Sequence, residues 1–66
     1  MKRVLYETGS GKYVGIRDED GEVIFVSDLE KAWSPPPQKA DVTLTEIKAV
    51  FDLQWLDTLE WRDYEN

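Results

Sequence analysis

The chain of 66 residues contains no cysteine and no histidine. Zinc, haem and iron–sulfur centres depend on thiolate or imidazole ligands, so this composition excludes them, together with disulfide bonds. We therefore expect no metal and no cofactor. A domain of this size buries only about 60% of the surface that its unfolded chain exposes, so its stability must come from dense packing or from a second subunit.

Long apolar runs are also lacking. No segment approaches the ~20 apolar residues that a membrane-spanning helix needs, and the N-terminus has no basic start followed by an apolar run. We therefore expect a cytoplasmic protein that does not contact a membrane.

Basic residues are scarce, with eight Lys and Arg against fourteen Asp and Glu, for a net charge of −6. Residues 1–40 hold seven acids and six bases, whereas residues 41–66 hold seven acids and two bases, a net charge of −5. An acidic surface repels the phosphates of nucleic acids and of anionic lipids. The composition therefore favours a protein partner with a basic surface.

The first half of the chain has the composition of a small β-sheet. Segments 3–7, 12–18 and 22–26 are rich in β-branched and aromatic residues, and turn-forming residues with glycine separate them. This pattern predicts a three-stranded antiparallel meander. Ser27 is placed as an N-cap with Glu30 three residues later, which predicts a short helical turn that ends near Trp33.

The second half contains a proline run and a predicted long helix. Pro35, Pro36 and Pro37 mark residues 34–42 as a stiff connector. Thr43 and Glu46 form a second capping pattern, and no Gly or Pro follows it, so we expect a helix over 43–63. Residues within one half of this helix would cover the sheet: Leu44, Ile47, Val50, Phe51, Trp55, Leu59 and Trp61. The predicted fold is α+β, a single domain over 1–66 in which residues 1–33 form the meander and its helical turn.

Two features of the predicted helix suggest binding. Ala49, Leu53 and Leu56 would form a second apolar strip opposite the first, which is typical of a homodimer seam or of a docking site, although isolated exposed leucines are also ordinary. Acidic residues would project along the same helix as a partner-binding face: Asp52, Asp57, Glu60, Asp63 and Glu65.

Catalytic and nucleotide-binding patterns are incomplete. Segment 9–12 reads Gly-Ser-Gly-Lys but lacks the helix that a phosphate-binding loop requires, and segment 18–22 has too few correctly spaced oxygens for a calcium loop. No pair of carboxylates is distinguished as an acid–base pair. We therefore expect a protein that is not an enzyme.

The leading hypothesis is a non-enzymatic inhibitor or regulator whose acidic helix occupies a basic, nucleic-acid-binding groove of another protein. Small acidic proteins encoded by phages or mobile elements often act in this way, which is an analogy of class. The alternative is a homodimeric structural or adaptor subunit, assembled through Ala49, Leu53 and Leu56. In either case Trp33, beside the proline run, is a candidate aromatic anchor.

Overall fold

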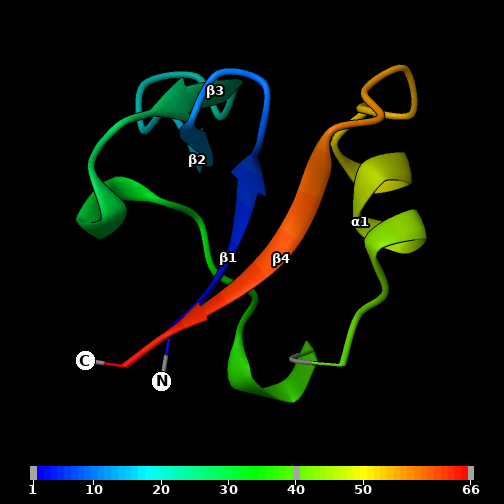
Figure 1. The fold of residues 1–66 in the computed structure, drawn as a ribbon. Helices are drawn as coiled ribbons and strands as arrows, with labels where there is room; N and C mark the ends of the chain where they lie inside the picture. The colour runs from blue at the N-terminus through cyan, green and yellow to red at the C-terminus, as the bar shows by residue number, and fades with distance from the viewer. Residues whose placement is uncertain (1, 40, 66) are drawn as a thin grey trace.

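The computed structural model describes residues 2–39 and 41–65 and contains one antiparallel sheet. Four strands lie in the order β3-β2-β1-β4 (Figure 1). Their bounds are Lys2–Glu7 for β1, Lys12–Ile16 for β2, Val23–Val26 for β3 and Leu59–Tyr64 for β4. The expected three-stranded meander is therefore wrong, because a fourth strand completes the sheet.

The three expected N-terminal strands are present, and glycines shape the turns between them. Gly11 and Gly21 both have a φ of 72°, in the left-handed region that suits glycine. In the second hairpin Val14 pairs with Phe25 and Gly15 with Ile24. A 3₁₀ turn over Leu29–Lys31 follows β3, and its N-cap is Asp28 in place of the expected Ser27.

The expected helix over 43–63 is wrong. Helix α1 spans only Leu44–Val50, although it begins as expected, with the Thr43 side chain accepting a hydrogen bond from the Glu46 amide. The helix ends because Asp52 adopts a left-handed φ of 57° and the Leu53 amide donates back to the Lys48 carbonyl at 2.8 Å. These bonds satisfy carbonyls that a longer helix would have used, as in other left-handed helix ends.

Residues 59–64, which we expected to be helical, form strand β4. The strand pairs with β1 along its whole length, from Lys2 opposite Tyr64 to Glu7 opposite Leu59. Leu59 and Trp61 alternate with Glu60 and Arg62, a period of two that is typical of a strand with one face toward a core. This tertiary pairing outweighs the absence of helix-breaking residues.

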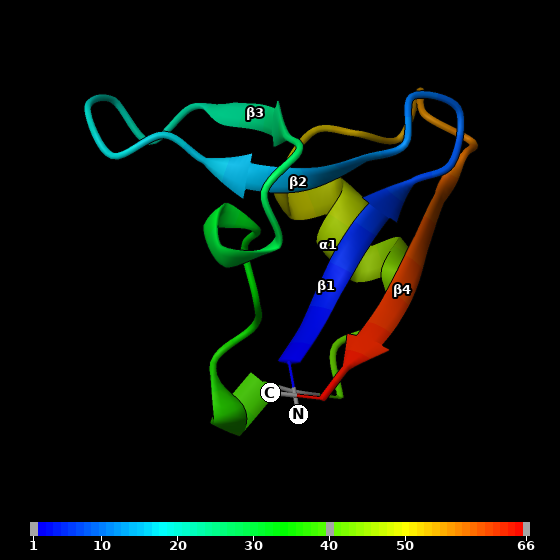
Figure 2. The same cartoon turned by 60° about the vertical axis from the view of Figure 1, so that its left-hand side comes forward.

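The core lies between α1 and one face of the sheet (Figure 2). Its buried members come from three strands, from α1 and from the loop after α1: Leu5, Val14, Ile47, Leu53 and Leu59. Two residues that we expected in the core are instead exposed, Val50 at 72% and Trp55 at 70%. Trp55 lies in the loop that follows the helix end, and Val50 lies on a side of α1 that is open to solvent.

The connector after β3 runs beside the sheet and then toward α1. The Trp33 amide donates to the Val14 carbonyl at 2.8 Å, and the Lys2 ammonium donates to the Leu29 carbonyl at 2.8 Å. A second 3₁₀ turn covers Pro37–Lys39. Across the described ranges, no helix has the length and apolar character to cross a membrane.

Candidate binding groove between the connector and α1

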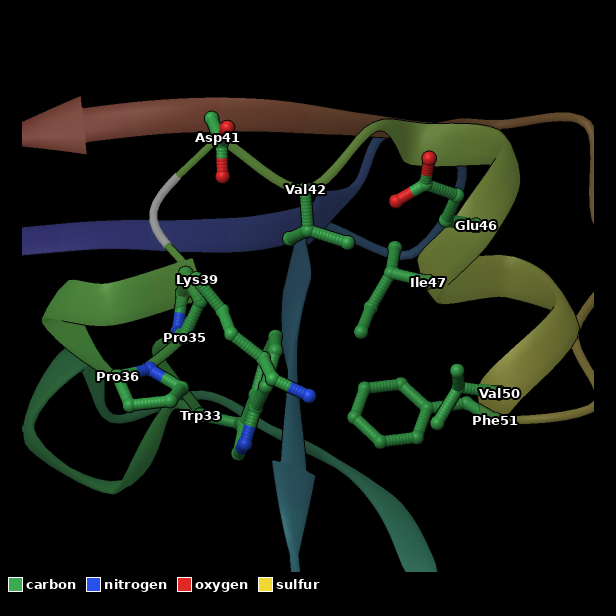
Figure 3. Close-up of a pocket in the computed structure, with 10 residues that line it drawn as sticks. All are labelled: Trp33, Pro35, Pro36, Lys39, Asp41, Val42, Glu46, Ile47, Val50 and Phe51. Carbon is green, nitrogen blue, oxygen red and sulfur yellow. The ribbon is translucent and has the colours of Figure 1, made fainter.

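A groove of about 510 Å³ opens between the proline connector and α1 (Figure 3). This volume lies within the range of ~300–1,000 Å³ that is typical of ligand pockets. Ten residues line the groove: Trp33, Pro35, Pro36, Lys39, Asp41, Val42, Glu46, Ile47, Val50 and Phe51.

Two aromatic rings form the apolar part of the groove. The ring of Trp33, from the connector, meets the ring of Phe51, from the end of α1, at a centroid distance of 4.9 Å and an interplanar angle of 84°. This edge-to-face geometry is a favourable arrangement of two aromatic rings. Ile47 is buried beside them, with 5% of its surface exposed. The wall is therefore anchored to the core of the domain.

Two features of the backbone fix the position of the connector on its side of the groove. Pro35 and Pro36 fix their φ angles, and the Trp33 amide is bonded to the Val14 carbonyl of β2. On the other side, the Thr43 cap fixes the first turn of α1. The two walls are thus set before any ligand arrives, which lowers the entropic cost of binding.

Charged groups lie at the rim of the groove. Figure 3 shows the side chain of Lys39 extending from the connector across the view toward Phe51, with the carboxylate of Asp41 on the connector side and that of Glu46 on α1. Val50, which is 72% exposed, completes the rim on α1. The groove therefore combines an apolar interior with a charged margin, the pattern of a site that receives an apolar side chain.

The described ionisable residues that line the groove are Lys39, Asp41 and Glu46. Within residues 2–39 and 41–65, no group of three or more His, Cys, Asp or Glu side chains is placed to hold a metal ion. Glu7, whose carboxyl pKa is lowered to about 2, lies outside the groove.

Glu7 serves the hairpin between β1 and β2. Its carboxylate accepts hydrogen bonds from the amides of Gly9 and Ser10, at 2.8 and 2.7 Å, and from the hydroxyl of Thr58. The Thr58 hydroxyl and then the Gly9 amide lower the pKa of Glu7 to about 2, from an ordinary value of 4.5. The side chain is 8% exposed and ties the first turn to the start of β4, so its role is structural.

The acidic residues expected on one helical face are not brought together. Asp52 lies in the turn after α1, Asp57 lies in the loop before β4, and Glu65 follows the end of β4. Glu60 and Asp63 point to opposite faces of β4, because they are three residues apart in a strand. Glu60 pairs with Arg62 at 2.9 Å, and Asp63 with Arg3 at 3.8 Å. The premise of an acidic helix is therefore wrong.

The expected apolar strip is likewise divided. Ala49 is exposed on α1, Leu53 is buried at 5% in the core, and Leu56 is half-buried in the loop. The continuous helical seam that we inferred from their spacing does not form. Trp33, the candidate aromatic anchor, lines the groove.

Val50 and Phe51 were not predicted as groove residues, because their helical spacing predicted that both pack against the sheet. The groove joins residues 33–39, 41 and 42 to residues 46–51, and only the tertiary packing of the connector against α1 shows their proximity. Comparisons of the chain with protein-family models, with curated proteins and with solved structures find no match.

Proposed function

We propose that this protein is a non-enzymatic binding module that receives an apolar side chain of a basic partner protein in the groove between the connector and α1, and thereby inhibits or regulates that partner. The observation that carries the proposal is the pair of Trp33 and Phe51 rings at 4.9 Å inside an open groove of about 510 Å³. Large aromatic side chains of this kind dominate the energetics of protein interfaces.

Charge supports a basic partner. The net charge of −6 attracts a basic protein over distances of about a Debye length, ~8–10 Å at moderate salt. At the groove itself, Asp41 and Glu46 outnumber Lys39. Basic residues beside the inserted apolar side chain would face these two carboxylates, so the attraction would act on the association rate and on specificity.

The test compares two substitutions on α1. Val50→Lys places a charged side chain at the rim of the groove, whereas Ala49→Lys makes the same change of charge one residue earlier, at an exposed position that does not line the groove. Each immobilised variant is incubated with cell lysate at low salt and eluted with increasing salt. Bound proteins are identified and quantified by mass spectrometry.

We expect a basic protein that elutes from the wild type and from Ala49→Lys at moderate salt and whose recovery falls about tenfold or more with Val50→Lys, as for a substitution that costs at least about 1.4 kcal/mol at an interface. Equal losses with both variants would show that only net charge matters and would contradict the groove. A specific loss with Ala49→Lys would instead place the contact on the part of α1 around Ala49, which does not line the groove, and would also contradict the proposal.

A further inference from the structure

Strand β3 is a short edge of the sheet with no charged side chain of its own. Its four residues, Val23–Val26, include no charged side chain, whereas the opposite edge strand, β4, carries Glu60, Arg62 and Asp63. Charged residues on an edge strand discourage the addition of another strand. Among the described elements, none lies beyond β3 on the side away from β2 (Figure 2).

The hydrogen-bond pattern identifies which backbone groups of β3 face outward. The Arg17 amide donates to the Glu22 carbonyl at 2.9 Å, which places Arg17 and Glu22 in a hydrogen-bonded pair. Because such pairs alternate along antiparallel strands, Ile24 and Val26 also bond to β2. The amide and carbonyl groups of Val23 and Phe25 therefore point away from β2, where an added strand would bond to them.

Hollows lie beside β3 on both faces of the sheet. One hollow, of about 370 Å³, includes Phe25 from β3 together with Trp55 and Leu56 from the loop before β4. The other, of about 520 Å³, includes Ile24 and Val26. Side chains of a strand alternate between the two faces. An added strand would therefore place successive side chains in the two hollows in turn.

Charge indicates what kind of strand would bind. Residues 17–31, which contain β3 and its two flanks, hold six acidic residues and two basic residues, Arg17 and Lys31, for a net charge of −4. A second copy of this chain, paired antiparallel through β3, would bring Glu22 toward Asp28 of its neighbour, and these like charges repel. A segment with an apolar centre and basic ends matches both the strand and its flanks.

We propose that β3 binds an extended, basic-flanked segment of a partner protein as a fifth strand of the sheet. Backbone hydrogen bonds to Val23 and Phe25 would provide affinity, and the two hollows would provide specificity for alternate side chains, as in other cases of strand addition. This surface uses residues other than those of the groove, so the inference goes beyond the function proposed above.

The probe is an acetylated and amidated peptide of sequence Lys-Lys-Val-Ile-Val-Ile-Lys-Lys, and the measurement is amide hydrogen exchange by NMR on the whole chain. When the peptide occupies about nine-tenths of the protein, exchange should slow about tenfold at Val23 and Phe25. The amides of Ile24 and Val26, which already bond to β2, should change little. The indole resonance of Trp55 should shift, and that of Trp33 should not.

Two matched comparisons test the pairing and the charge. Val23→Pro removes one outward donor at the first residue of an edge strand, a position that tolerates proline, and Val23→Thr retains the donor. The proline variant should bind the peptide about three- to tenfold more weakly than the threonine variant. A peptide with glutamate in place of lysine should bind at least about fivefold more weakly, because its ends meet the acidic flanks.

Several results would overturn the proposal: no slowing at Val23 and Phe25, equal binding of the two peptides, or a shift of the Trp33 indole in place of Trp55. The same protection without peptide, together with a doubled mass in light scattering, would show that a second copy is the occupant and would also overturn it. Hydrogen exchange of the wild-type protein with the peptide tests the proposal without any variant. The test therefore remains even if Val23→Pro does not fold. Val50→Lys should leave peptide binding unchanged, which separates failure of this proposal from failure of the groove.

Discussion

The two edges of the sheet are built from different chemistry. Edge strand β4 is held by side-chain contacts, because Arg62 pairs with Glu60 at 2.9 Å and lies 3.7 Å from the centre of the Tyr6 ring. Tyr64 meets Tyr13 through their hydroxyl groups at 3.1 Å. Edge strand β3 has no such polar contacts among its described side chains, and Phe25 is 37% exposed. Side chains tie β4 to its neighbouring strands, and we call it the closed edge, whereas β3 has only apolar side chains, and we call it the open edge.

The largest change in the free energy of unfolding is expected when one apolar side chain is shortened at each edge of the sheet. Leu59→Ala removes a core residue of β4 that is 6% exposed, and it should lower the free energy of unfolding by about 2–5 kcal/mol. Phe25→Ala, at the partly exposed edge, should cost less, because the ring of Phe25 is partly in water in the folded chain and a cavity there is open to solvent. Urea unfolding followed by circular dichroism measures both. Equal losses would contradict the difference between the edges.

The next effect concerns Glu7, which joins the first hairpin to the start of β4. Its pKa of about 2 in the folded chain is below the ordinary 4.5, so its contribution to stability is full above pH 4.5 and is lost as the pH falls toward 2. The urea midpoint of the wild type should therefore fall over this range, and that of Glu7→Gln should fall less. Identical pH profiles for the two proteins would contradict this role.

The third prediction weakens the closed edge directly. Arg62→Ala removes an exposed ion pair with Glu60 and the contact with the Tyr6 ring, and it should lower the thermal unfolding midpoint by less than Leu59→Ala does. Arg62→Lys retains the charge and should lose less, because the planar guanidinium suits both contacts better. Thermal unfolding at low and high salt measures the two variants. A loss as large with lysine as with alanine would exclude a role for charge.

The sequence indicated the open edge better than the closed one. The first three strands and the start of α1 could be predicted because turn glycines and the Thr43 cap act through local chemistry. The helix end at Val50 and strand β4 could not, because the left-handed Asp52 and the pairing of Leu59 with Glu7 depend on contacts formed only after folding. The alternation of Leu59 and Trp61 with Glu60 and Arg62 was the available signal, and the absence of Gly and Pro obscured it.

The candidate groove was predicted only through Trp33. That tryptophan stands beside a proline run, which keeps the chain extended and marks it in the sequence. The other wall, which includes Val50 and Phe51, could not be predicted, because its place beside the connector depends on how α1 packs in the folded chain. The predicted acidic face does not form because α1 ends at Val50, and all of the acidic residues assigned to it lie after that helix end.

The smallest expected effect is that of a change of charge at one end of β3, compared with the same change beyond the end of β4. Glu22→Lys, at one end of β3, should change the free energy of unfolding by less than about 0.5 kcal/mol, because the side chain is exposed. It should nevertheless weaken binding of the lysine-flanked peptide about two- to fivefold. Glu65→Lys makes the same change beyond the end of β4 and should leave peptide binding unaffected. Calorimetric titration of both variants measures the difference.

The central claim, that the groove receives an apolar side chain of a basic protein, is tested most directly by the three indole resonances in an NMR titration with the partner recovered from lysate. Trp33 lies in the groove, Trp55 lies beside β3, and Trp61 lies against Arg3, 4.6 Å from its guanidinium carbon to the ring centre. The account predicts that the Trp33 resonance shifts as the partner binds and that Val50→Lys abolishes this shift. Saturable binding that leaves the Trp33 resonance in place would contradict it.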